Sequence, residues 1–211
     1  MSVPEHLRVK REPQRGRYDR PTIDAILDEA LYCHLGFAVE RQPFVIPTLH
    51  ARVGDRLYVH GSAASRMLRH AASGLRICVT VTLLDGLVLA KSVFNHSINY
   101  RSAVVIGTAT LVEGEEKLDA LRAFTEHIAP GRWREARRPT QRELKATSTL
   151  VLPLDEASAK VRTGPPKDER DDLSLPVWAG VVPIHLAAEP SPYRWARVHD
   201  GRVGPPDTIA G

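Results

Sequence analysis

The Asp85-Gly86 pair, set between two long runs of β-forming residues, restricts the possible folds of this chain more than any other feature. LRICVTVTLL precedes the pair and LVLAKSVF follows it. An Asp-Gly pair between such runs is the strongest short signal for a tight β-hairpin. The sequence therefore predicts two antiparallel strands joined by a turn at residues 85 and 86.

Further strand-like segments lie on both sides of this pair. The segments before it are HLGFAVER, FVIPTLHARV and RLYVHG, with Gly54-Asp55 as the turn between the last two. The segments after it are RSAVVIGTATLVEG, TLVLPLD, SAKVRTG and VWAGVVPIHLA. Strands and crossover helices do not alternate, so we predict a mainly β protein rather than a doubly wound parallel sheet. Its expected form is a closed or nearly closed antiparallel barrel of six or seven strands with peripheral helices.

Four segments have helical periodicity. PTIDAILDEALYC places apolar residues on one face, with Thr22 as a candidate N-cap. SRMLRHAAS contains helix formers, and Ser62 is a candidate N-cap for a short helix there. EEKLDALRAFTEHI repeats Leu121, Phe124 and Ile128 on one face, and PTQRELKA predicts a further turn or two.

The length of 211 residues is sufficient for one domain with a proper core. We expect a basic N-terminal arm over residues 1–19, a folded domain over 20–187 and a Pro-rich tail over 188–211. Within the domain, GPPKDERDDLSLP predicts a surface loop.

The formal net charge of +4 does not indicate nucleic-acid binding. The basic residues are concentrated in the arm and in GRWREARR, and no recognition motif accompanies them, so a basic arm and a solvated loop are the preferred interpretation. Cys33 and Cys78 share no metal-ligand spacing and are expected to be buried thiols in a reducing compartment. The sequence has no signal-peptide pattern and no membrane-span pattern, so we expect a soluble cytoplasmic protein.

The segment HGSAASRMLR, from His60 to Arg69, has the composition of an anion site. A strand ends there and a helix begins, so free backbone N–H groups and the positive end of the helix dipole would face a bound group. Ser62 and Ser65 can donate hydroxyl hydrogen bonds, and Arg66 can form a bidentate contact. A phosphate fits best. An ordinary capped helix with a solvated arginine is the alternative.

Four blocks of this sequence resemble the pyridoxamine 5'-phosphate oxidase-like flavin-nucleotide-binding proteins, which include nitroimidazole reductase-like members. The blocks are PTLHARVGDRLYVHGSAASRMLR, CVTVTLLDGLVLAKSVFNHSINYRSAVVIG, ELKATSTLVLPLDEASAKVRTGPP and WAGVVPI, in the family order. The resemblance implies a six-stranded Greek-key split β-barrel. It also implies a homodimer that binds FMN in the groove between its protomers.

The resemblance also assigns cofactor-binding residues. Ser65 and Arg66 match the phosphate-binding pair, and Met67 stands where true pyridoxamine phosphate oxidases have a lysine, which removes one phosphate cation. The remaining positions that match flavin contacts or lie beside them are Thr48, His60, Gly61, Ser62, Asn99, Arg101, Ser102 and Trp178.

Several residues keep two interpretations. Trp178 is either core or close to the cofactor, and His96 is either a proton donor or only hydrogen-bonded. Lys160 and Arg162 are either solvated charges or part of the site or dimer. Arg197 and His199, in ARVHDGR, partly match a substrate clamp that an inserted glycine interrupts. The histidines show no metal-ligand spacing, so we expect no structural metal.

The function that follows is an FMN-dependent oxidoreductase of unknown small-molecule substrate, in which the flavin supplies the redox chemistry. The sequence contains no recognisable Ser-His-Asp, metal or paired-carboxylate arrangement, so hydrolysis is not expected. A non-catalytic flavin-storage protein is the alternative, and so is a barrel that uses haem, a deazaflavin or pyridoxal phosphate.

Overall fold

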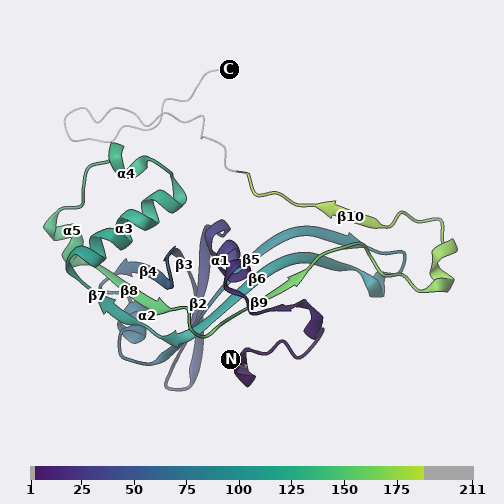
Figure 1. Ribbon diagram of the computed structural model, residues 1–211, viewed down its shortest axis with the longest axis horizontal. Coiled ribbons are helices and arrows are strands. Elements are labelled where there is room, and N and C mark those ends of the chain that lie inside the picture. Colours follow the sequence, from purple (N-terminus) through teal and green to yellow (C-terminus); the bar gives the residue numbers. More distant parts are fainter. Residues whose placement is uncertain (1–2, 188–211) are drawn as a thin grey trace, which may run out of the picture.

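The computed structural model describes residues 3–187 (Figure 1). The strands are β1 (Gly16–Arg17), β2 (Tyr32–Val39), β3 (Gln42–Val53), β4 (Arg56–Ser62), β5 (Arg76–Leu89), β6 (Ser97–Thr108), β7 (Thr110–Val112), β8 (Thr147–Pro153), β9 (Ala157–Arg162) and β10 (Gly180–Pro183). The α-helices are α1 (Arg20–Glu29), α2 (Arg66–Ala71), α3 (Gly114–Ile128), α4 (Arg132–Glu135) and α5 (Gln141–Ala146). The 3-10 turns are η1 (Glu5–Leu7), η2 (Pro13–Arg15), η3 (Val93–Asn95) and η4 (Arg170–Ser174).

The protein is mainly β, and its strand pairs are antiparallel, as predicted. Neighbouring strands follow the order β1-β9-β6-β5-β2-β3-β4-β8-β7, and β10 pairs with β5. The expected number of strands was too low, because the described residues form ten. The order has two ends, β1 and β7, so it does not confirm a closed six-stranded barrel.

The predicted hairpin turn at Asp85-Gly86 is wrong. Both residues lie inside β5, and the pairing with β6 shifts register there, between Leu84 and Gly86. Two long-range contacts explain the bulge. Arg101 on β6 binds the Asp85 carboxylate, and β10 passes so close that a Cβ on Gly86 would lie 2.9 Å from the Val182 carbonyl oxygen. The chain turns later, through η3.

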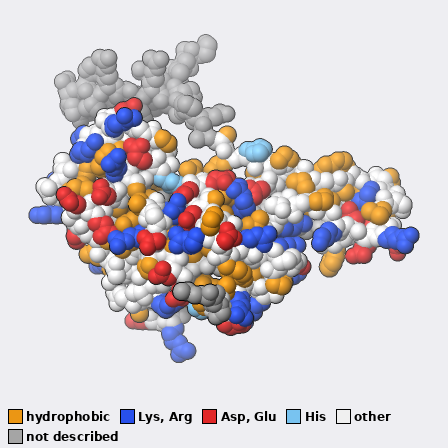
Figure 2. Space-filling view, viewed as in Figure 1, with side chains coloured by type: hydrophobic (Ala, Val, Ile, Leu, Met, Phe, Trp, Pro, Cys, Tyr) orange, Lys and Arg blue, Asp and Glu red, His pale blue; other side chains and the backbone are white. Residues whose placement is uncertain are grey.

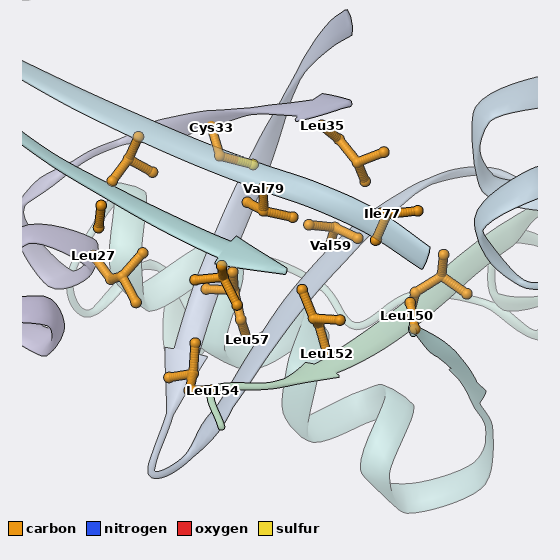
Figure 3. Packing of buried hydrophobic residues seen from close by; sticks show 14 of the residues in the cluster. Leu27, Cys33, Leu35, Leu57, Val59, Ile77, Val79, Leu150, Leu152 and Leu154 are labelled. Carbon is orange, nitrogen blue, oxygen red and sulfur yellow. The ribbon is translucent and has the colours of Figure 1, made fainter. Parts of the chain in front are cut away.

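The core lies between the strands of the sheet, with α1 and α2 packed against it. Figure 3 shows side chains from β2, β4, β5 and β8 meeting in this space, among them Leu35, Leu57, Val79 and Leu150. A second cluster forms where α3 covers the other face of β3 and β4, and it includes Tyr58 and Phe124.

Two predicted helix starts move by three residues. Asp19 rather than Thr22 caps α1, because its carboxylate accepts the Thr22 N–H at 3.0 Å. Ser65 rather than Ser62 is the N-cap of α2. In both cases the residue at the observed N-cap is also a cap-forming type and lies within one turn of the predicted one.

The N-terminal segment lies against the sheet. Leu7 is buried, and Gly16–Arg17 pairs with Ala159 and Lys160 of β9. The predicted boundaries at residues 19 and 187 stay predictions, and the predicted tail lies outside the described residues. In residues 3–187 no helix has the length and hydropathy needed to cross a membrane. The cytoplasmic location also stays a prediction.

The distal halves of β5 and β6 extend away from the core as a long arm, together with β10, η3 and η4 (Figure 1). We call residues 84–98 and 165–186 the arm. It exposes many large apolar side chains, among them Val93, Phe94, Leu173, Val177, Trp178 and Leu186. A side chain such as Phe94, 92% exposed, gains nothing from packing in this protomer.

Candidate functional site

The segment from His60 to Arg69, which has the composition of an anion site, connects β4 to α2, as predicted. Ser65 has extended backbone angles and starts the helix, but its hydroxyl makes no capping hydrogen bond. The Ser62 hydroxyl accepts the Ala64 N–H at 3.2 Å. α2 is held in place by its buried residues Met67 and Leu68. The Ser65 hydroxyl is therefore available at a firmly packed helix start.

Arg66 is exposed, and its guanidinium lies over the Phe44 ring at 4.4 Å from the ring centroid. Within residues 3–187 it forms no ion pair with a carboxylate. Stacking on an aromatic face restricts the side chain while leaving the edge of the guanidinium open. Arg66 is thus positioned and available for an anionic group.

Thr48 and Gly61 support this segment. The Thr48 hydroxyl donates to the His60 carbonyl oxygen at 3.2 Å, which links β3 to β4. A Cβ on Gly61 would lie 3.1 Å from Leu68 Cδ1, so glycine permits the close approach of α2 to β4. Both residues lie in the predicted region.

His60 faces a different space from the one expected. Its side chain lines an apolar pocket of about 510 Å³ between β3, β4 and the segment from α3 to α5. The ring meets Phe124 edge-on at 4.3 Å, and no hydrogen bond to the ring occurs within residues 3–187. Burial lowers the pKa of His60 below its usual value, which favours a neutral imidazole.

The rest of the pocket wall was not predicted. It includes Leu49 from β3, Leu121, Phe124 and Ile128 from α3, and Trp133, Arg137 and Leu144 from the following segment. The apolar face of α3 was visible in the sequence as a helix pattern. Nothing in that pattern shows that part of the face lines a cavity instead of core.

Arg101 is engaged by acidic side chains of its own chain. It forms ion pairs with Asp85 at 2.7 Å and with Glu29. The hydrogen bonds to Glu29 and then to Asp85 raise the pKa of Arg101. These contacts occupy most of its N–H donors, so a flavin contact by this side chain stays a prediction.

The other β6 residues are also hydrogen-bonded inside the protomer. Asn99 is buried, donates to the Gly164 carbonyl oxygen at 3.1 Å and accepts from Arg162. The Ser102 hydroxyl donates to the Lys160 carbonyl oxygen at 3.4 Å. Arg162 therefore supports Asn99 and is not simply a solvated charge.

Trp178 is 64% exposed, so the core interpretation of this residue is wrong for one protomer. Its ring folds over Gly180, where a Cβ would lie 2.6 Å from the indole. His96 accepts the Ala90 N–H through Nδ1 at 3.1 Å, which agrees with a hydrogen-bonded loop histidine. Arg197 and His199 lie outside the described residues.

One protomer does not bring all these residues together. Arg101 stands seven residues from Thr108, which pairs with Arg76 just after α2. At about 3.3 Å per residue, on the order of 20 Å of strand separates Arg101 from the end near α2. The predicted residues thus form one group at α2 (Thr48, His60, Gly61, Ser62, Ser65, Arg66) and a second, the group at the arm, that consists of Trp178 in the arm and three residues of β6 next to it (Asn99, Arg101, Ser102).

Known proteins resemble this chain in sequence and in fold. A family described as pyridoxamine 5'-phosphate oxidase matches residues 19–161. The structure of the flavocytochrome Anf3 from Azotobacter vinelandii is 41% identical in sequence, has a TM-score of 0.82 and is matched over 95% of this chain and 98% of its own.

Two further solved structures are similar. The FAD and haem binding protein from Mycobacterium smegmatis is 36% identical, with a TM-score of 0.79 and coverage of 90% of this chain and 94% of its own. A proposed 5-nitroimidazole antibiotic resistance protein from Bacteroides thetaiotaomicron is 23% identical over 69% of this chain and 86% of its own, with a TM-score of 0.57, and shares the fold. No curated protein matches the sequence.

Proposed function

The chain belongs to the pyridoxamine 5'-phosphate oxidase family, and we propose that it is a flavin-dependent oxidoreductase that also binds haem. The similar structures at 41% and 36% identity are described as a flavocytochrome and as an FAD and haem binding protein. The observation that carries the proposal is the apolar pocket that His60 lines, with a ring that has no hydrogen bond within residues 3–187 and a pKa that burial lowers.

The flavin nucleotide binds with its phosphate at Ser65 and Arg66. These two residues offer a hydroxyl, a stacked guanidinium and the N-terminal end of a packed helix. FMN and FAD both carry a phosphate on the ribityl chain, so the same group serves either one. FMN is the family expectation, and FAD is the flavin in the description of the Mycobacterium protein.

The pocket suits haem in size and in chemistry. Its volume of about 510 Å³ lies within the range of roughly 300–1,000 Å³ typical of cofactor sites. Leu49, Leu121 and Phe124 offer an apolar wall, and Arg137 is a cation in the same wall for a propionate. Histidine is a common protein ligand of haem iron, so His60 is the residue that would bind the iron in this proposal.

When bound, the flavin supplies hydride and one-electron transfer and the haem supplies one-electron and O₂ chemistry. The chain itself binds and orients these two cofactors. Ser65 and Arg66 hold the phosphate, while Leu121, Phe124 and Trp133 exclude water from the pocket. Keeping His60 deprotonated leaves its lone pair free for a metal.

Two protomers complete the flavin site in this proposal. The group of residues at α2 and the group at the arm lie far apart in one chain, and a homodimer can bring one group to the other. The exposed apolar side chains of the arm support this arrangement, since exposed apolar patches of a soluble protein often mark an interaction surface. In Figure 2 they are seen as orange patches along the arm.

The six-stranded split barrel also belongs to the proposal. β6 pairs with β5, β7 pairs with β8, and only Ala109 separates β6 from β7. If β6 and β7 count as one bent strand, it joins β5, β2, β3, β4 and β8 in a ring of six. The covalent link between β6 and β7 would then close the barrel, because β6 pairs with β5 at one end of the strand order and β7 pairs with β8 at the other.

The test is a pair of variants with opposite expected effects. Purified protein is reconstituted with haem and with flavin, and the Soret and flavin absorption bands are measured. His60→Ala should lose the Soret band and keep the flavin band, whereas Arg66→Ala should keep the Soret band and bind flavin weakly. His34→Ala, which changes an exposed histidine, is the control.

Retention of a normal Soret band by His60→Ala would remove haem from this pocket. Anaerobic addition of NADH, NADPH or dithionite then separates the functions. A flavin that binds tightly but is reduced by none of them would favour the storage protein. Absence of flavin binding with tight binding of haem, a deazaflavin or pyridoxal phosphate would favour the corresponding alternative.

A further inference from the structure

Residues 132–145, which we call the basic segment, carry a net charge equal to that of the whole chain. The segment contains six Lys or Arg residues and two Glu residues, a net +4, and all 211 residues together also have a formal net charge of +4. All six cationic side chains are exposed. Lys and Arg side chains stand out over α4 in Figure 2.

The acidic side chains of the segment are already paired. Glu135 binds Arg132 at 3.0 Å, and Glu143 binds Arg137 at 2.5 Å. The remaining cations of α4 and α5, Arg134, Arg142 and Lys145, form no ion pair with any residue in the range 3–187. They are therefore available to an external anionic surface.

The neighbouring carboxylate of Glu126 attracts Arg134 but forms no close ion pair with it within residues 3–187. It accepts the Gly131 N–H at 2.6 Å and the Trp133 N–H at 3.1 Å, which ties the start of α4 to α3. These two backbone hydrogen bonds hold the pKa of Glu126 below its usual value. The carboxylate thus positions the basic segment on α3.

The same segment forms the outer wall of the apolar pocket. Trp133, Arg137 and Leu144 line the cavity, while Arg134 and Arg142 are exposed. The cations are spread over two helices and the segment between them. A broad protein surface fits such a distribution better than one small anion.

We propose that the basic segment docks an electron-carrier protein with an acidic surface. This inference rests on the proposed function, because it places the donor beside the pocket wall. In the transfer, the reduced carrier loses one electron and the oxidised cofactor of this protein gains it. Opposite charges raise the encounter rate and orient the partners without a large apolar interface, as in other transient redox pairs.

The probe is a plant-type [2Fe–2S] ferredoxin, which is an acidic one-electron carrier. Its binding to the full-length protein is measured by calorimetry at several salt concentrations, and its rate of electron transfer by stopped flow. We expect binding that weakens as salt rises. Arg134→Glu/Arg142→Glu/Lys145→Glu should lower the second-order rate by about 10-fold or more at low salt and should flatten the salt dependence.

Matched variants separate charge from folding. Arg11→Glu/Arg41→Glu/Arg8→Glu makes the same change of charge outside the segment and should leave most of the rate intact. Arg134→Gln/Arg142→Gln/Lys145→Gln should give an intermediate rate without like-charge repulsion. Reduction by dithionite, a small reagent, should be equally complete in every variant.

Equal rates in the two charge-reversed proteins, or binding that does not depend on salt, would overturn the docking site. Selective binding of basic cytochrome c would do the same. So would tight binding of duplex DNA or anionic vesicles through the segment without ferredoxin binding. Calorimetry does not require a redox step, so ferredoxin binding without cofactor reduction would count against the proposed function alone.

Discussion

At the scale of single residues, the contacts of a side chain decide whether it is free to act. Arg66 and Arg101 have the same guanidinium group and were both predicted to contact the flavin. Arg66 stacks on an aromatic ring with its edge open, whereas Arg101 is bound by two carboxylates. We therefore base the phosphate contact on Arg66.

Replacement of Arg66 by alanine should weaken FMN or FAD binding by about 10-fold or more, because a charge-assisted contact to phosphate is lost. Riboflavin, which lacks the phosphate, should bind the variant and the natural protein equally well. Fluorescence titrations with the three flavins measure the effect. Arg69→Ala, one turn along α2 and also exposed, is the control. An equal loss for riboflavin would place Arg66 away from the phosphate.

His50 should make the protein less stable in mild acid. Its ring is fully buried and Nε2 donates to the Leu27 carbonyl oxygen at 2.8 Å, while Nδ1 has no hydrogen-bond partner among residues 3–187. Burial lowers its pKa, and nearby His127 adds to that effect. The unfolded chain therefore binds this proton more readily than the folded protein. The free energy of unfolding should decrease as the pH falls below about 6.5.

Urea unfolding at a series of pH values tests this expectation. His50→Gln keeps an N–H donor but does not titrate, so its stability should change less over the mildly acidic range. His34→Gln should behave as the natural protein. The carboxylates of Glu143 and Glu156, whose pKa values are lowered to about 2 by their arginine partners, affect stability only at lower pH. If the free energy of unfolding depends on pH in His50→Gln as it does in the natural protein, His50 is protonated in the folded protein as readily as in the unfolded chain.

At the scale of elements, α2 links packing to binding. Its six residues bury Met67, Leu68 and Ala71 against the sheet and present Arg66 to solvent. A helix this short is not stable alone, so its position depends on tertiary contacts. The same contacts then fix where Ser65 and Arg66 lie.

Leu68→Ala should lower the free energy of unfolding by about 2–5 kcal/mol, the usual cost of a cavity at a fully buried leucine. Leu68 is 1% exposed and packs on Gly61. Flavin affinity should also decrease, because the phosphate group of residues is less well fixed. Chemical denaturation and flavin titration measure the two effects. If the destabilised variant keeps full flavin affinity, the position of α2 does not determine flavin binding.

At the scale of the whole molecule, the arm has no role that one protomer explains. Val88 and Ala90 are buried within the protomer, but many of its large apolar side chains, such as Val93 and Phe94, are exposed, although β5, β6 and β10 are well paired there. A partner protomer would bury them and supply the distant half of the site.

Val93→Asp/Phe94→Asp should convert the proposed dimer to monomers at low micromolar concentration. The two side chains are 85% and 92% exposed, so the change should cost the folded protomer little but would bury charges in an interface. A permanent dimer interface of this kind should exceed about 2,000 Å². Sedimentation equilibrium measures the change.

Val45→Asp is the matched control, since Val45 is 67% exposed on β3, outside the arm. Flavin affinity should decrease together with dimerisation in the arm variant only. A natural protein that is monomeric and still binds one flavin tightly per chain would contradict the shared site.

The sequence by itself determined the local parts of this protein. Alternating β-branched residues identified β2, β3, β4, β8 and β9, the Gly54-Asp55 turn was correct, and α3 and α5 lie where their periodicity predicted. The strand-to-helix junction before Arg66 was predicted correctly because caps, glycines and helix starts act within a few residues. Four blocks in order also identified the family correctly.

Only the tertiary structure decided the long-range features. Asp85-Gly86 became a bulge because Arg101 and β10 contact it from distant parts of the chain. The His60 side chain lines a pocket because α3 packs over β4. The Arg101 guanidinium is held by ion pairs with Glu29 and Asp85. Local propensity sets backbone conformation over a few residues, whereas the partners of a side chain depend on segments that only folding brings together.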